Sequence, residues 1–124
     1  MGNRFALGIT PGWNADEIAL LGHDPKTRGQ RFVESIKIIQ GLWSNDLFSF
    51  EGEHYQFKDV GISPRPTTTP PQIFIGGNSS IAIKRAASNS GWIAMNHPLE
   101  ELGELLSTLG ELSGDEAEKI CYCH

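Results

Sequence analysis

Two short, largely apolar runs constrain the fold of this chain more than any other feature of its sequence. Residues 72–75 read Gln-Ile-Phe-Ile, and residues 92–95 read Trp-Ile-Ala-Met. Runs of this kind are typical of strands that are buried on both faces of a parallel sheet. Residues 79–88 between them predict a helix that begins at Ser79 or Ser80, and parallel strands need such a crossover. The two runs therefore indicate an α/β fold.

Strands and helices also alternate along the rest of the chain. Residues 4–9 predict a strand with Phe5, Leu7 and Ile9 on one face. Helix start and stop residues, together with apolar spacing, predict further helices over 15–21, 24–43 and 99–112. We therefore expect adjacent parallel strands at 4–9, 72–76 and 92–95.

Two segments depart from this alternation. Residues 48–57 predict two short strands around Gly52, a hairpin outside the sheet, and residues 58–72 read as an extended, proline-rich connector. From Ser113 onward the sequence is polar, which predicts a frayed tail over 113–124.

Charge and hydropathy exclude several classes of protein. The net charge is −5 and no basic cluster is present, whereas a nucleic-acid binder needs a basic face. No apolar run approaches the roughly 20 residues that cross a bilayer, and residues 1–20 lack the pattern of a secretory signal. We therefore expect no nucleic-acid or membrane partners. The two cysteines lie together at the chain end and form no disulfide framework, which predicts a reducing, cytoplasmic setting. Cys121, Cys123 and His124 are crowded at the chain end and make a poor metal site, so we expect no metal.

The most informative candidate site is the turn Gly76-Gly77-Asn78-Ser79-Ser80, which joins an apolar strand to a helix. Glycines let backbone amides approach a ligand closely, and the helix N-terminus supplies N–H donors and a positive dipole end. The turn is thus a candidate phosphate site. The alternative is a tight turn with a serine cap and no ligand.

Other candidates carry weaker signals. Arg28 stands near a helix start and can face an anionic ligand, while Arg31 and Glu34 have the spacing of an ordinary surface ion pair. Trp13 follows the first strand, where it can stack on a flat ring but more often serves as a core or lid residue. The histidines at 23, 54 and 97 show no ligand spacing. No pair of residues has the pattern of a catalytic pair, so no catalytic residues are assigned.

Several stretches of the sequence together resemble the luciferase-like monooxygenase family, and most closely its deazaflavin-dependent (coenzyme F-420) branch. They are Arg-Phe-Ala-Leu-Gly-Ile-Thr-Pro-Gly-Trp at 4–13, Leu-Gly-His-Asp-Pro-Lys-Thr-Arg-Gly-Gln-Arg-Phe-Val-Glu at 21–34, Phe-Glu-Gly-Glu-His-Tyr-Gln-Phe at 50–57, Ser-Pro-Arg-Pro at 63–66 and Ile-Phe-Ile-Gly-Gly-Asn-Ser at 73–79. The resemblance covers residues 3 to about 112.

The resemblance implies a (β/α)₈ TIM barrel that binds a flavin or deazaflavin (FMN or coenzyme F-420) and oxidises or reduces a small organic substrate. It places the cofactor phosphate on Gly76, Gly77, Asn78 and Ser79, with Arg28 as a further contact.

A full barrel needs about 250 residues, so we expect a partial barrel over 1–112 that resembles units 4–6. The family's usual Gly-Asp-Gly-Trp is Asn-Ser-Gly-Trp at 89–92, and the tail matches nothing in the family. We therefore expect a fragment that is inactive alone and self-associates through open sheet edges, with Phe5, Ile73, Phe74 and Trp92 open to water. The alternatives are a non-catalytic α/β remnant, a subunit that completes a barrel with another chain, and an unrelated phosphate-binding barrel segment.

Overall fold

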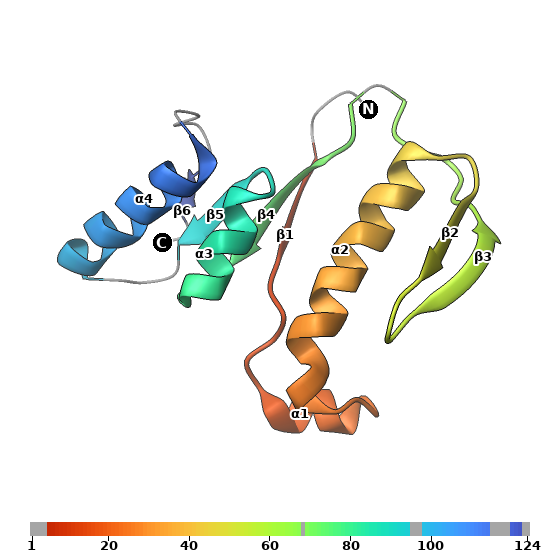
Figure 1. The fold of residues 1–124 in the computed structure, drawn as a ribbon, viewed down its shortest axis with the longest axis horizontal. Helices are drawn as coiled ribbons and strands as arrows, with labels where there is room; N and C mark the ends of the chain where they lie inside the picture. Colours follow the sequence, from red (N-terminus) through yellow and green to blue (C-terminus); the bar gives the residue numbers. More distant parts are fainter. Residues whose placement is uncertain (1–4, 68, 95–97, 115–119, 123–124) are drawn as a thin grey trace. The chain divides into compact units, whose positions relative to one another are not determined.

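The structure is a computed structural model that describes residues 5–67, 69–94, 98–114 and 120–122 (Figure 1). These residues divide into two compact units. One unit runs from Pro11 to Pro70, and the other combines the first strand with the chain from Pro71 onward.

The second of these units is built on a parallel sheet with the strand order β1-β4-β5-β6. Its strands are β1 (Ala6–Ile9), β4 (Gln72–Gly76), β5 (Gly91–Ala94) and β6 (Ile120–Tyr122). Ile9 pairs with Ile75, and Ile75 with Trp92. The expected parallel neighbours are therefore confirmed, and the fold is mixed α/β.

Helices α3 (Ser80–Ala87) and α4 (Leu99–Ser113) pack against each other, and α3 packs on β4 and β5 (Figure 1). This packing buries a core of apolar side chains, which are Ile73, Ile75, Ala82, Ile83, Ala86, Trp92, Ala94 and Leu109. The expectation that Ile73 and Trp92 lie open to water is wrong. Successive strand residues point to opposite faces, and both of these belong to the buried set, whereas Phe74 is half-buried and Phe5 is 60% exposed.

The end of the chain also differs from expectation. Residues 120–122 form β6, which pairs in parallel with β5, so a frayed tail is wrong for these three residues. Ile-Cys-Tyr is a run with high strand propensity, and the edge of β5 offers it unpaired backbone groups. Residues 115–119, 123 and 124 lie outside the described residues.

The other unit begins with α1 (Ala15–Leu20), which Asn14 caps by accepting the amides of Asp16 and Glu17. A 3₁₀ turn, η1 (Pro25–Thr27), precedes the long helix α2 (Arg28–Ser44). The single helix expected over 24–43 therefore starts with a tighter turn. Asp24 accepts the amide of Lys26, a bond over two residues that holds the backbone in the tight turn.

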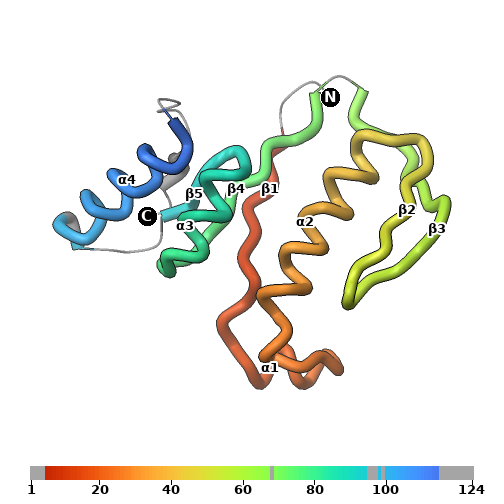
Figure 2. Tube along the Cα trace, viewed as in Figure 1, coloured from red at the N-terminus to blue at the C-terminus, as the bar shows by residue number. Residues whose placement is uncertain are grey.

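Antiparallel strands β2 (Phe48–Glu51) and β3 (Gln56–Val60) form a separate hairpin, as expected, although β3 continues to Val60. The hairpin follows α2 within the same unit, as the tube in Figure 2 shows. The rings of Phe48, Phe50 and Phe57 cluster with centroids 6.0 to 6.3 Å apart.

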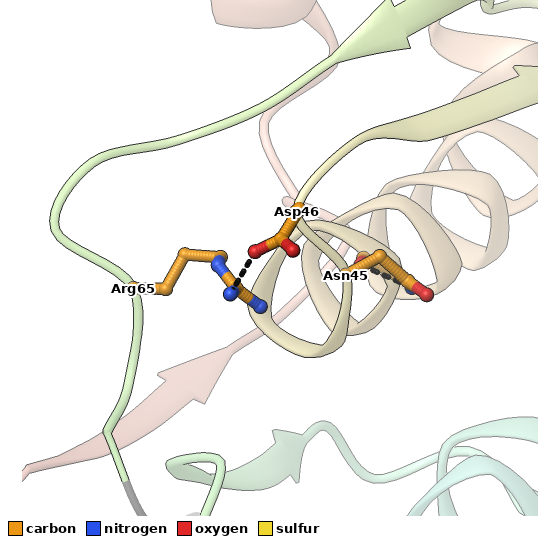
Figure 3. Close-up of polar contacts among 4 residues, drawn as sticks. Asn45, Asp46 and Arg65 are labelled. Carbon is orange, nitrogen blue, oxygen red and sulfur yellow. Dashed lines mark hydrogen bonds and ion pairs between the residues drawn. The ribbon is translucent and has the colours of Figure 1, made fainter.

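The connector after β3 is tied back to the end of α2. Arg65 donates through Nη2 to the Asp46 carboxylate, while the side chain of Asn45 bonds the carbonyl of Gly41 (Figure 3). No helix within the described ranges is both long and apolar enough to cross a bilayer.

Candidate phosphate-binding loop

The four loop residues singled out by the sequence lie together between β4 and α3. Gly76 is the last residue of β4 and is buried, and Gly77 follows it directly. A Cβ on Gly76 would lie 2.7 Å from Thr10 Cγ2. Because real Cβ atoms essentially never approach so closely, glycine is required where β4 passes beside the end of β1.

Gly77 needs glycine for a different reason. Its φ is +123°, in a region that side-chain-bearing residues rarely adopt, and a Cβ there would lie 3.2 Å from the Cβ of Ala82. Its carbonyl accepts a hydrogen bond from Trp92 Nε1 at 2.8 Å. The Gly77 carbonyl is therefore held by the indole of Trp92, while the Cβ position of Gly77 faces Ala82 of α3.

Ser79 caps α3, as expected, because its Oγ accepts the amide of Ala82 at 3.2 Å. The amides of Ser80 and Ile81 come earlier in the same turn, where a helix has no carbonyl of its own to offer them. Asn78 and Ser79 are exposed. The loop thus presents backbone donors, a hydroxyl and the positive end of a helix dipole at one place, an arrangement that suits an anion.

Arg28 is the first residue of α2 and belongs to the other unit. Its Nη1 donates to the carbonyl of Pro25 at 2.8 Å, and the side chain is exposed. A contact between Arg28 and a ligand in the loop therefore remains a prediction.

The expected pairing of Arg31 with Glu34 is wrong, since both side chains have other partners. Arg31 Nε donates to Thr27 Oγ1 at 3.1 Å. The Glu34 carboxylate accepts backbone amides from the hairpin turn, at 2.8 Å from Glu53 and 3.1 Å from both His54 and Tyr55. Glu34 therefore fastens the hairpin to α2.

This arrangement also sets the ionisation of Glu34. Desolvation at the hairpin raises the pKa of Glu34, but the three backbone hydrogen bonds and the charge of His54 together lower it below its ordinary value. Sequence reasoning missed this role. The signal in the sequence was a helical glutamate followed by a Gly-Glu-His turn, whose own glutamate lies 19 residues later.

The remaining sequence candidates are not gathered into a site. Trp13 is 90% exposed, so the interpretation as a core residue is wrong. His23 is exposed, and the His54 ring lies 3.4 Å from Gln30 Oε1, in line with the expected structural or exposed roles. His97 lies outside the described residues.

In place of the family's usual aspartate, Ser90 joins β4 to β5. Its Oγ accepts the amide of Ile73 at 2.9 Å, and its own amide donates to the Ile73 carbonyl at 2.9 Å. Within the described ranges, no three His, Cys, Asp or Glu side chains gather in a way that would hold a metal ion. Cys123 and His124 lie outside those ranges.

The sequence signature of the luciferase-like monooxygenase family matches residues 1–120. The chain belongs to this family. An uncharacterised protein of Mycobacterium tuberculosis is 37% identical over 120 residues, which are 96% of this chain and 41% of that protein. The FMNH₂-dependent dimethylsulfone monooxygenase of Pseudomonas putida is 37% identical over 77% of this chain and 27% of its own length.

Two further proteins are similar to this chain. The F-420-dependent glucose-6-phosphate dehydrogenase of Amycolatopsis mediterranei is 34% identical over 73% of this chain and 28% of its own length. The monooxygenase RslO1 of Streptomyces bottropensis has the same fold, with a TM-score of 0.83 and 21% identity over 96% of this chain and 39% of that chain. The chain spans about two fifths or less of the relatives that it matches.

Proposed function

We propose that Gly76, Gly77, Asn78 and Ser79 hold the phosphate of a flavin or deazaflavin cofactor in an oxidoreductase that acts on a small organic molecule. The observation that carries the proposal is the bare backbone of the loop at the start of α3. Glycine is required at 76 and 77, and the serine cap leaves two amides ahead of it in the first turn.

The residues present fit a phosphate group. A side chain at Gly77 would press on Ala82, in the first turn of α3 that supplies the amides, at a φ that side-chain-bearing residues rarely adopt. The Ser79 hydroxyl uses its oxygen to accept the amide of Ala82, so its hydrogen is available to a phosphate oxygen. Arg28 would add a positive charge if the two units bring it to the same phosphate.

Membership of the luciferase-like family supports a flavin-type cofactor, and two relatives are named for FMNH₂ and F-420 dependence. Once bound, such a cofactor supplies hydride or oxygen transfer at its ring system. The part assigned to this chain is to bind and orient the cofactor by its phosphate. FMN and coenzyme F-420 both carry that phosphate, so the loop chemistry serves either.

A pair of titrations tests the proposal. FMN and coenzyme F-420 are each compared, by fluorescence, with riboflavin and with the deazaflavin chromophore that lacks the phosphate chain. We expect the phosphorylated member of at least one pair to bind more tightly. Equal affinity for the phosphorylated and unphosphorylated members of both pairs would contradict the proposed phosphate site.

Gly77→Val supplies the matching variant. A β-branched side chain at a φ of +123° is strained by about 1–3 kcal/mol, and its Cβ would press on Ala82 in the first turn of α3. Relief of this strain would displace the loop backbone, so the preference for the phosphorylated cofactor should fall at least about tenfold. Gly22→Val is the control, because Gly22 has a φ of +81° and lies far along the chain at the end of α1. An equal loss of preference in both variants would mean that strain, not the loop, accounts for the effect.

A further inference from the structure

We infer that Trp92 is a positioning residue for the phosphate loop, where it directs the amide of Asn78 toward the ligand. This inference rests on the proposed function, since it concerns how the same loop acquires its donors. Trp92 lies on β5, outside the loop, and would not touch the phosphate itself.

The side chain of Trp92 is completely buried, with 0% exposure. A buried indole N–H needs an acceptor, and here the acceptor is the Gly77 carbonyl at 2.8 Å. The Gly77 carbonyl must therefore point inward, toward the covered side of the sheet.

The direction of that carbonyl fixes the next amide. The only cis peptide bond among the described residues is Ser63–Pro64, so the bond between Gly77 and Asn78 is trans. In a planar trans peptide the C=O and N–H groups point in opposite directions. The Asn78 amide consequently points away from Trp92, and Asn78 is an exposed residue.

Gly77 alone does not hold this orientation. Glycine tolerates both signs of φ, so a free Gly77–Asn78 peptide can rotate and present its carbonyl to a phosphate instead of its N–H. A carbonyl oxygen facing a phosphate is repulsive, whereas an oriented N–H is a charge-assisted donor. The indole hydrogen bond selects the productive orientation before the ligand arrives.

Trp92→Phe tests this reasoning, because phenylalanine retains an apolar ring but has no N–H. Loss of one oriented donor to a charged group should weaken FMN relative to riboflavin by about tenfold, with riboflavin itself little changed. Trp43→Phe, on α2 in the other unit, is the matched control and should leave the ratio unchanged.

A substitution that keeps the shape of tryptophan separates positioning from packing. In a Trp13→Phe, Trp43→Phe background, Trp92 is replaced by 3-benzothienylalanine, which differs from tryptophan mainly in having sulfur in place of the indole N–H. We expect the same fall in the FMN-to-riboflavin ratio as in Trp92→Phe. An unchanged ratio would overturn the positioning role, because the packing is retained.

A spectroscopic measurement follows the amide directly. On titration with inorganic phosphate, the Asn78 amide resonance should shift downfield in the parent chain and stay in place when the indole N–H is absent. If the parent chain and both Trp92 variants prefer FMN to riboflavin by the same factor, the positioning role fails and the phosphate loop stands. If the parent chain shows no such preference, the proposed function itself fails.

Discussion

Replacement of helical glycines by alanine provides a strong test of how α2 packs. In an exposed helix interior, Gly→Ala stabilises by about 1 kcal/mol, because glycine loses more backbone entropy on folding. Gly103 and Gly110 of α4 have nothing within 4 Å of an added Cβ. Each change should therefore raise the free energy of unfolding by about 1 kcal/mol.

Gly41 of α2 should respond with the opposite sign. A Cβ there would overlap three atoms of the Phe48 ring, with Cε2 at 2.6 Å, although ordinary contacts begin at 3.4 Å. The nearest ring atom would have to move by more than an ångström to reach ordinary contact, while the ring also packs with its centroid 6.0 Å from that of Phe57. Overpacking costs roughly 1–3 kcal/mol. Because all three ring atoms must move, the upper part of that range applies, and about 1–2 kcal/mol of net destabilisation remains after the helix gain.

Urea unfolding followed by circular dichroism measures all three variants. We expect Gly103→Ala and Gly110→Ala to move the midpoint upward and Gly41→Ala to move it downward. The double variant Gly41→Ala, Phe48→Ala removes the ring and should recover the helix gain relative to Phe48→Ala alone. If Gly41→Ala stabilises the chain as much as Gly110→Ala does, the packing of the hairpin on α2 is wrong.

The strands and helices were predictable because their signals are local. The apolar runs that became β4 and β5, and the caps at Asn14 and Ser79, depend only on neighbours within a few residues. The parallel arrangement followed from the helix between the two strands. The loop at Gly76 and Gly77 was located for the same reason, since a strand, two glycines and a capped helix are contiguous.

The contacts that organise the loop and the hairpin were not predictable, because they join residues far apart in sequence. Trp92 reaches Gly77 across 15 residues, and Glu34 reaches Tyr55 across 21. Both residue types have an ordinary local explanation, as a core tryptophan and as a surface glutamate with Arg31 three positions away. Tertiary packing, which a short sequence window does not contain, determined the partner that each acquired.

The remaining predictions concern the core and the hairpin. Ile83→Ala removes a side chain with 0% exposure beneath α3 and should cost about 2–5 kcal/mol, measured by urea unfolding; a loss below 1 kcal/mol would mean that α3 is not packed on the sheet. Glu34 should make the hairpin sensitive to acid. Its pKa in the folded chain lies below the ordinary value of 4.5, so its stabilisation is complete above that pH and disappears as the pH falls through the lowered pKa. Glu34→Gln offers a donor NH₂ where Tyr55 needs an acceptor, so exchange protection of the turn amides should be lower at neutral pH and no longer fall in acid. The control Glu51→Gln, at an exposed position on β2, should retain the loss of protection in acid. If Glu34→Gln also retained that loss, the acid sensitivity of the hairpin would belong to another carboxylate.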